Sequence, residues 1–160
     1  MQNGATNSAA KMRKICRVTS RRTSHPYQRR PSLADRIVLD ASAVIAVLRG
    51  EVGAERVVAV IDNSIVSSVN LAEVQTNLVD AGMDENLAWF HIATLGLPSV
   101  PFDDALARIT GALVRYTRPL GLSLGDTACL ALAINRKAKV YTADRAWKAL
   151  SLGIEIEVIR

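Results

Sequence analysis

The chain has 160 residues, of which 49% are hydrophobic and 22% are charged, an average composition for a soluble globular protein. This composition excludes disordered, collagen-like and coiled-coil proteins, and no apolar run reaches the ~20 residues that a membrane-spanning helix needs. The two cysteines and two histidines do not have the spacing of a zinc site or of a disulfide framework. We therefore expect a cytoplasmic protein with one sizeable core.

The formal net charge of +5 has its origin in the first 34 residues. They include eight basic residues and no acidic one, whereas residues 35–160 include 12 basic and 15 acidic residues. Residues 1–34 are rich in Ser, Thr and Asn and have no apolar periodicity, so we expect a disordered extension before a folded domain at 35–160. The extension has three interpretations: an arm that binds polyanions, an organelle address, or a start codon assigned too far upstream.

From Arg36 onward, short β-branched runs alternate with longer helical patterns, which is typical of an α/β fold with a parallel sheet and helical crossovers. The sequence predicts strands at residues 36–40, 64–68, 98–102, 139–142 and 154–159. It predicts helices at residues 42–49, 53–61, 70–82, 84–95, 103–117, 123–137 and 144–151. We expect Trp89, Phe90 and Trp147 to pack in the core of this fold; the alternative is that they line a groove for a partner.

Four acidic residues occupy related positions in the predicted fold. Asp40 ends the first strand and Asp144 follows the fourth. Glu73 is predicted in the first turn of the helix after the second strand, and Asp126 one turn into helix 123–137. Because crossovers in a parallel sheet are right-handed, strand ends and helix starts share one edge, where open α/β folds bind their ligands. We therefore expect the four side chains to lie along that edge.

Each acidic residue also has an alternative explanation as part of a helix cap. Asp40 and Asp144 could be N-caps, and the segments that begin at Asn70 and Ser123 both resemble capping boxes. Capping does not require four acids in one pocket, and two carboxylates ~4 Å apart repel by ~4 kcal/mol at an effective dielectric near 20. Such a cluster needs a cation, and an all-oxygen ligand set favours Mg²⁺ or Mn²⁺.

The same residue types suggest a reaction. Since no Ser-His or Cys-His pair is available, the expected nucleophile is a water molecule whose pKa is lowered by a bound cation. Asp40 and Asp126 would hold one or two ions, while Glu73 and Asp144 would complete the ligand shell or orient the water.

Two arginines near these acids are candidates for contacts with a phosphate group. Arg145 adjoins Asp144, and Arg118 lies in the loop before Asp126. The alternative is that both are ordinary solvated or salt-bridged side chains.

The four acids lie in the segments IVLDASAVIAVL, SSVNLAEV, GLSLGDTACLALA and VYTADRAW. In order and spacing these segments resemble those of PIN-domain ribonucleases and, within that group, the VapC-type toxins of bacterial toxin–antitoxin pairs. The similarity covers residues 36–160. It implies a PIN-like three-layer α/β/α sandwich with a central parallel sheet of four to five strands. It further implies a homodimeric, Mg²⁺- or Mn²⁺-dependent endoribonuclease that cuts RNA and is neutralised by a VapB-type antitoxin.

The resemblance also assigns roles by position. It gives catalytic and metal-binding roles to the counterparts of the family's three core acids and of a more variable fourth one: Asp40, Glu73, Asp126 and Asp144. The hydroxyl groups of Ser42 and Thr142 match positions that support the acidic pocket.

Two other functions stay open at this point. A PIN-like domain could bind RNA or a protein without cutting. A phosphatase of the haloacid dehalogenase type also has an aspartate at the end of its first strand, but it needs a second aspartate two residues later, where this chain has Ser42. The sequence has no Walker or dinucleotide-binding glycine pattern, which argues against enzymes with nucleotide cofactors.

Overall fold

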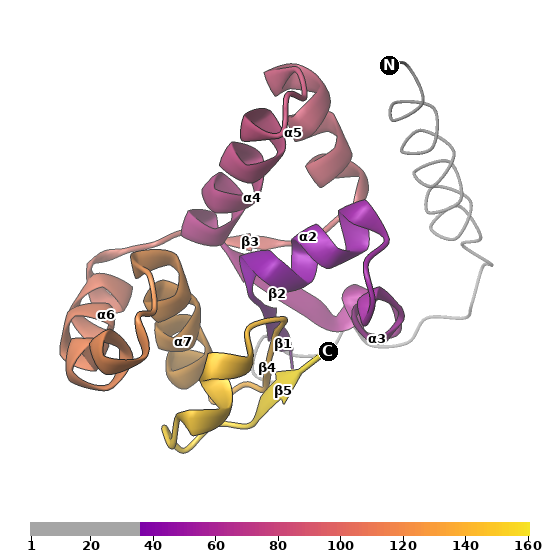
Figure 1. Cartoon of the computed structure of the whole chain (residues 1–160). Helices are drawn as coiled ribbons and strands as arrows, with labels where there is room; N and C mark the ends of the chain where they lie inside the picture. The colour runs from indigo at the N-terminus through magenta and orange to yellow at the C-terminus, as the bar shows by residue number, and fades with distance from the viewer. Residues whose placement is uncertain (1–35) are drawn as a thin grey trace, which may run out of the picture.

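A computed structural model describes residues 36–160, so the interpretations of residues 1–34 concern a segment outside the described part. Five strands form one sheet in the order β3-β2-β1-β4-β5, and every neighbouring pair is parallel. The strands are β1 (Ile37–Leu39), β2 (Ser64–Ser67), β3 (Ser99–Val100), β4 (Val140–Thr142) and β5 (Ile156–Val158). The predicted α/β class with a central parallel sheet is confirmed (Figure 1).

Helices fill the crossovers between the strands. The α-helices are α2 (Ala41–Arg49), α3 (Ala54–Val58), α4 (Ser68–Asp80), α5 (Glu85–Thr94), α6 (Asp104–Thr117) and α7 (Leu124–Arg136). Three short 3₁₀ helices are η2 (Ile61–Asn63), η3 (Arg118–Leu120) and η4 (Arg145–Ala149). Within residues 36–160, no helix has the length and apolar character needed to cross a bilayer.

Three predicted helices differ from those observed, and one of them, predicted at 70–82, is α4 and begins earlier, at Ser68. The helix predicted at 53–61 ends at Val58 with Ala59 as its C-cap, and the chain then tightens into the 3₁₀ helix η2. The segment 144–151 forms the tighter 3₁₀ helix η4 instead of an α-helix. Its Trp147 is fully buried, as predicted. This large side chain therefore enters the core within a few residues of the end of β4.

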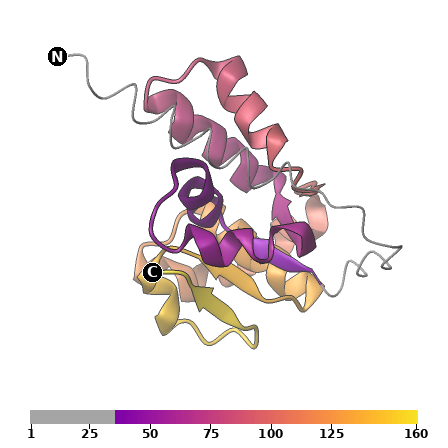
Figure 2. The same ribbon diagram turned by 90° about the vertical axis from the view of Figure 1, so that its right-hand side faces the viewer.

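The sheet separates two apolar layers, as the period-two alternation of strand side chains requires. Leu39 and Val66 face one layer, to which α2, α3, α4 and α5 contribute. The neighbouring residues Val38 and Ile65 face the other layer, which is covered by α6, α7 and η4. The predicted three-layer arrangement is therefore present, with the helices on both sides of the sheet (Figures 1 and 2).

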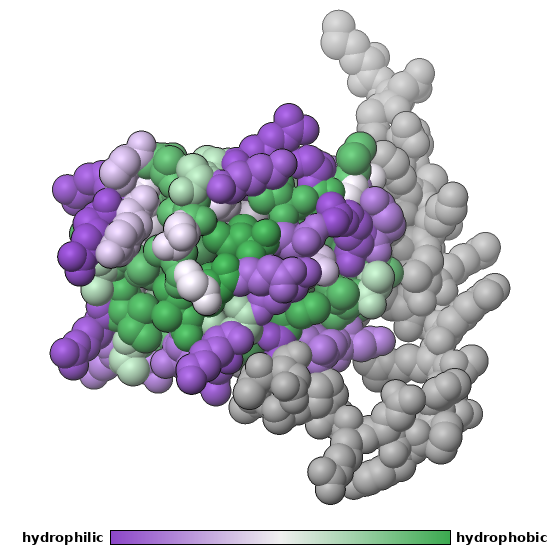
Figure 3. All heavy atoms as spheres, turned by 90° about the horizontal axis from the view of Figure 1, so that it is seen from below, coloured by the Kyte–Doolittle hydropathy of each residue, from purple (hydrophilic) through white to green (hydrophobic). Residues whose placement is uncertain are grey.

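Helices α4 and α5 form a hairpin that extends away from the sheet (Figure 2). The prediction that Trp89 and Phe90 pack in the core is wrong, because their side chains are 51% and 62% exposed. Helix α5 buries Ala88 and Ile92, and its other large apolar side chains face outward. Apolar surface also occurs elsewhere: Figure 3 shows apolar side chains in the middle of one face, with hydrophilic ones around them.

The strand order has a topological switch beside β1. The chain adds β2 and β3 along one edge of β1, and it then returns to add β4 and β5 along the other edge of β1. Open α/β sheets bind their ligands outside the carboxyl ends of the strands at such a point. Asp40 directly follows β1 and Thr142 ends β4, so both residues lie at the switch.

Gly53 allows the loop before α3 to approach the end of the chain's last strand. Its φ is 87°, and an added Cβ would lie 2.5 Å from the carbonyl oxygen of Ile159. We expect Gly53→Ala to lower the free energy of unfolding by about 2–3 kcal/mol, through a strained φ and a clash with backbone. Gly82→Ala is the matched control, because Gly82 has the same φ of 87° with nothing within 4 Å of the added Cβ. Equal losses of stability in urea unfolding would contradict the role of the clash.

Candidate active site

Asp40 is the buried centre of a group of acidic side chains at the switch point. It is 2% exposed and is the N-cap of α2. Its Oδ2 accepts hydrogen bonds from the Ser42 N–H (3.2 Å), the Ser42 hydroxyl and the Thr142 hydroxyl (3.0 Å). Its Oδ1 accepts one from the Asn70 amide (3.4 Å). The carboxylate is thus held on both oxygens and cannot turn away from the site.

The Ser42 and Thr142 hydroxyls join the ends of β1 and β4. The two hydroxyl oxygens are 3.2 Å apart, and each also accepts a backbone hydrogen bond from the segment after β4. The Ala143 N–H donates to Ser42 Oγ (2.8 Å), and the Asp144 N–H donates to Thr142 Oγ1 (3.1 Å). Both hydroxyls therefore donate toward Asp40 while their lone pairs fix the loop that carries Asp144.

Asp126 lies in the first turn of α7 and caps that helix. The Ser123 N–H donates to Asp126 Oδ2 (2.7 Å), and the Asp126 N–H donates to Ser123 Oγ (3.1 Å), which completes the predicted capping box. Among the described residues, Asp126 Oδ1 has no hydrogen-bond partner. The cap and a cation can therefore use different oxygens of the same carboxylate.

Glu73 reaches the site from α4, although its place in the helix differs from the prediction. The helix begins at Ser68 with Ser67 as its N-cap, so Glu73 lies beyond the first turn, and the predicted capping box at Asn70 is wrong. Ser67 is a good N-cap at the end of β2, and it starts the helix before Asn70 can do so. Asn70 is instead fully buried inside α4.

The pKa values of two acids are raised, and the charges of neighbouring carboxylates are among the causes. Burial raises the pKa of Asp40 to about 6, and the charge of Asp126 adds to this effect against the hydrogen bonds from Ser42 and Thr142. Burial also raises the pKa of Glu73 to about 7, with further contributions from the charges of Asp40 and Asp126. No salt bridge within residues 36–160 neutralises any of the three. The cluster therefore lacks a counter-charge of its own.

Cys129 lies in the core one turn beyond Asp126 on α7. It is fully buried, and burial together with the charges of Asp40, Asp126 and Glu73 raises the pKa of its thiol. A protonated, buried thiol is a poor nucleophile. Cys129 is thus a small core side chain, which agrees with the absence of a nucleophile pair in the sequence.

The donor set fits a hard divalent cation. The carboxylates of Asp40, Glu73 and Asp126 supply oxygen ligands, and the fully buried Asn70 has an Oδ1 atom without a hydrogen-bond partner. In their present rotamers, no three His, Cys, Asp or Glu side chains of residues 36–160 form a group ready to hold a metal ion. A cation at this site would therefore require the carboxylate side chains to move closer together than they lie in this structure, with Asp126 Oδ1 available while Oδ2 stays in the cap.

Asp144 is near this cluster but has a capping role of its own. Its carboxylate accepts a hydrogen bond from the Ala146 N–H (2.9 Å) as the N-cap of η4. Its connection to Asp40 passes through the Thr142 hydroxyl. Next to it, Arg145 donates from Nε to the Arg160 carbonyl (3.2 Å), so this arginine contacts the last residue of the chain.

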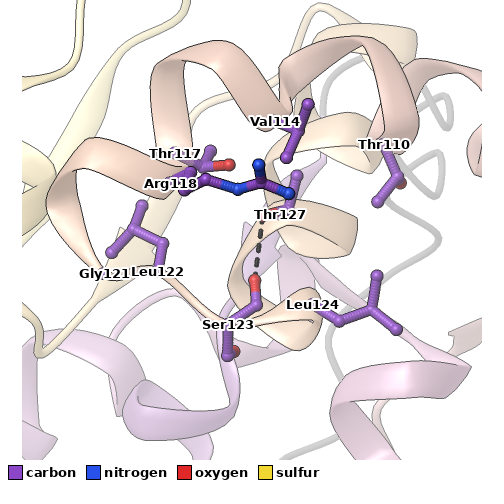
Figure 4. A pocket seen from close by; sticks show the side chains of 9 residues that line it. All are labelled: Thr110, Val114, Thr117, Arg118, Gly121, Leu122, Ser123, Leu124 and Thr127. Atoms are coloured by element: carbon purple, nitrogen blue, oxygen red, sulfur yellow. Dashed lines mark hydrogen bonds between the residues drawn. The ribbon is translucent and has the colours of Figure 1, made fainter.

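Arg118 lies over a pocket between α6 and the start of α7. The pocket has a volume of about 370 Å³, and its walls include Thr110, Val114, Leu122 and Thr127. Figure 4 shows the Arg118 side chain extending across this pocket toward Thr127. The wall also includes Ser123, whose N–H donates to Asp126, so the pocket directly adjoins the acidic cluster.

Sequence reasoning missed Asn70 and Gly125 as parts of the site. The Asn70 amide donates both to Asp40 and to the Gly125 carbonyl (3.2 Å). A Cβ built on Gly125 would lie 2.2 Å from Glu73 Oε2, so the glycine provides space for that carboxylate. Asn70 looked like a helix cap, and one glycine in an apolar helix gives no signal without knowledge of what packs against it.

A parallel α/β/α sandwich with carboxylates at the switch beside its first strand is the architecture of a PIN domain. The chain belongs to the PIN domain family, whose model matches residues 37–151. A search of curated proteins finds no match.

Solved structures with the same fold include three bacterial assemblies. VapBC2 from Rickettsia felis, bound to promoter DNA, has a TM-score of 0.61 at 17% identity, covering 78% of this chain and 98% of its own. DNA-bound VapBC from Salmonella typhimurium has a TM-score of 0.59 at 21% identity, covering 79% and 99%. FitAcB from Neisseria gonorrhoeae has a TM-score of 0.57 at 22% identity, covering 76% and 96%. At these identities the similarity is one of fold.

Proposed function

We propose that residues 36–160 form a Mg²⁺- or Mn²⁺-dependent endoribonuclease that hydrolyses RNA phosphodiester bonds. The observation that carries this proposal is the group of Asp40, Glu73 and Asp126 at the switch point, with which no basic side chain of residues 36–160 forms a salt bridge. Uncompensated carboxylates are unfavourable unless a cation joins them. Membership of the PIN family favours the nuclease over the phosphatase alternative.

The acids have two kinds of role in the proposed reaction. A bound divalent cation would activate a water molecule and stabilise charge on the phosphate. Asp40 and Asp126 would hold it, with Asp40 fixed by the Ser42 and Thr142 hydroxyls. Glu73 would complete the ligand shell or orient the attacking water.

Asp144 would have the more peripheral role of completing the ligand shell. In the present structure its carboxylate is the N-cap of η4. We therefore expect loss of this carboxylate to slow RNA cleavage less than loss of the Asp40 carboxylate.

We further propose that the chain is the toxin of a VapBC-type pair, a homodimer that binds a VapB-type antitoxin. The similar structures named above include VapBC assemblies. Residues 35–160 have 12 basic and 15 acidic residues, so a cationic segment of a partner would be attracted to the acidic cluster. The exposed Trp89 and Phe90 on α5 supply apolar surface that protein partners would bury.

The nuclease is tested by incubating the purified full chain with total RNA plus Mg²⁺ or Mn²⁺, or with EDTA, and sequencing new 5′ ends. Discrete cuts in metal and none in EDTA are expected, and their positions would identify the RNA. Folded protein that makes no cut with either metal would favour the non-catalytic RNA- or protein-binding alternative. Co-purification with the product of the neighbouring reading frame separately tests the antitoxin.

Arg118 is proposed to contact a phosphate of the bound RNA at the pocket beside the acidic cluster. We expect Arg118→Ala to raise KM several-fold with kcat largely retained, and to reduce the salt dependence of RNA affinity by about one phosphate contact. Arg115→Ala is the control, since Arg115 lies on α6 over the ring of Tyr116 (5.4 Å) and outside the pocket lining. Equal salt slopes for the Arg118→Ala variant and wild type in EDTA would refute this contact, and Arg145 would then be tested in the same way.

A further inference from the structure

Gly125 occupies a position in α7 where the backbone itself does not call for glycine. It is the second residue of the helix and is buried. Its φ is not among the positive values that L-residues avoid. Glycine inside a helix is less favourable than alanine, because it loses more backbone freedom on folding. A reason for glycine here must therefore come from its surroundings.

The surroundings consist mainly of one carboxylate. A Cβ added to Gly125 would lie 2.2 Å from Glu73 Oε2 and 3.1 Å from Glu73 Cδ. Its next contact would be Ser123 Oγ at 3.5 Å, which is an ordinary van der Waals distance. The Glu73 carboxylate thus occupies the volume that any larger residue at this position would need.

Asn70 fixes the same part of α7 relative to Asp40. Its buried amide donates to the Gly125 carbonyl (3.2 Å) and to Asp40 Oδ1 (3.4 Å). Asn70 and Glu73 are three residues apart on α4, so they lie on one face of that helix. One therefore holds the Gly125 carbonyl while the other places its carboxylate against the Gly125 Cα.

We infer that Gly125 is a positioning residue for Glu73: its missing side chain leaves the space in which the Glu73 carboxylate lies beside Asp40 and Asp126. The geometry stands independently of the reaction, and its catalytic consequence rests on the proposed function. A side chain at position 125 would displace the carboxylate from the cluster without touching Asp40 or Asp126.

The test compares Gly125→Ala with Gly111→Ala in the full chain. Gly111 is the matched control because it lies within α6 and nothing is within 4 Å of an added Cβ. Mn²⁺ affinity is measured by calorimetry, and RNA cleavage at saturating Mn²⁺. We expect the Gly125→Ala variant to lose about 10- to 100-fold in Mn²⁺ affinity or in kcat, the range seen when the partners of metal ligands are removed. The Gly111→Ala variant should match wild type in both.

A Glu73→Ala background separates displacement of the carboxylate from general damage to the helix. Without the Glu73 carboxylate, Gly125→Ala should raise the melting temperature as Gly111→Ala does, and it should no longer alter Mn²⁺ affinity. With Glu73 present, the gain in melting temperature should be smaller or reversed. An effect of Gly125→Ala that is the same with and without the Glu73 carboxylate would overturn the inference.

The two proposals fail in different ways. Wild-type protein that does not cut RNA would contradict the proposed nuclease. The melting temperatures of wild type, Gly125→Ala, Glu73→Ala and the double variant would still test whether a side chain at position 125 displaces the Glu73 carboxylate. Wild-type protein that cuts, together with a Gly125→Ala variant that matches it in cleavage and in Mn²⁺ affinity, would contradict the positioning role alone.

Discussion

The protein with Asp40→Asn is expected to lose RNA cleavage while remaining folded in the absence of metal. Cleavage should fall by more than the roughly 10- to 100-fold typical for an outer partner of a metal ligand, because Asp40 is proposed to bind the cation itself. The fold should persist because two effects oppose each other: the asparagine removes a charge that is 2% exposed and lies beside another carboxylate, but its amide keeps only one of the two acceptor oxygens that Ser42, Thr142 and Asn70 contact. Cleavage time courses and thermal unfolding in EDTA measure the loss of cleavage and the retention of the fold.

Asp103→Asn is the control for the change of charge at a helix start. Asp103 is the N-cap of α6 and accepts a hydrogen bond from the Leu106 N–H (2.9 Å), and asparagine is about as good an N-cap. This variant should change neither cleavage nor stability appreciably. A folded Asp40→Asn protein that cuts RNA at the wild-type rate would refute the assignment of the metal site.

The metal-free protein is expected to lose stability as the pH rises from about 4 to about 7. The pKa values of Asp40 and Glu73 are raised on folding to about 6 and about 7, so the folded state binds more protons than the unfolded state in this range. This contribution is fully present below the unfolded pKa values near 4 and is lost as the pH passes the folded values. For Asp40 the loss is on the order of 3 kcal/mol.

Urea unfolding at several pH values, with EDTA or with Mn²⁺, measures this linkage. The free energy of unfolding of wild type is compared with that of the Asp40→Asn/Glu73→Gln double variant. All other titrating groups are the same in the two proteins, so their contributions cancel in the difference. In EDTA, the free energy of unfolding of wild type should fall relative to that of the double variant between pH 4 and 7. Mn²⁺ should offset the fall at pH 7, because a ligand that binds the folded state at 100 times its Kd stabilises it by about 2.7 kcal/mol. If the free energy of unfolding of wild type rises with pH relative to that of the double variant in EDTA, the proposed cluster is contradicted.

The sequence was sufficient to predict the fold class because the relevant signals are local. The alternation of β-branched runs with helical patterns predicts the five strands along the chain, and right-handed crossovers predict that Asp40, Glu73 and Asp126 lie at one edge, but the order of the strands in the sheet had no signal of its own. Helix boundaries were less predictable, since Ser67 competes with Asn70 as the N-cap of α4 and starts the helix earlier. Local propensity cannot decide between two good caps three residues apart.

The features that escaped prediction depend on what packs across the molecule. Trp89 and Phe90 are exposed because the α4–α5 hairpin extends from the sheet and offers them no inner layer, although their residue types favour burial. Gly125 matters because α4 brings Glu73 against α7, a contact between residues 52 positions apart by subtraction. Such contacts are absent from any local sequence pattern.

The position of β1 at the centre of the sheet has a consequence for protein synthesis. Strand β1 is the first of the five strands to leave the ribosome, but one of its two neighbours in the sheet is β4. Val38 therefore pairs with Val140 only after β4 has been synthesised. Asp40 likewise acquires the Thr142 hydroxyl only after the polypeptide between them has been made. Contacts of such long sequence separation form late. In a nascent chain that has not yet released β4, Asp40 therefore lacks part of its hydrogen-bonded surroundings, and the acidic site is complete only late in synthesis.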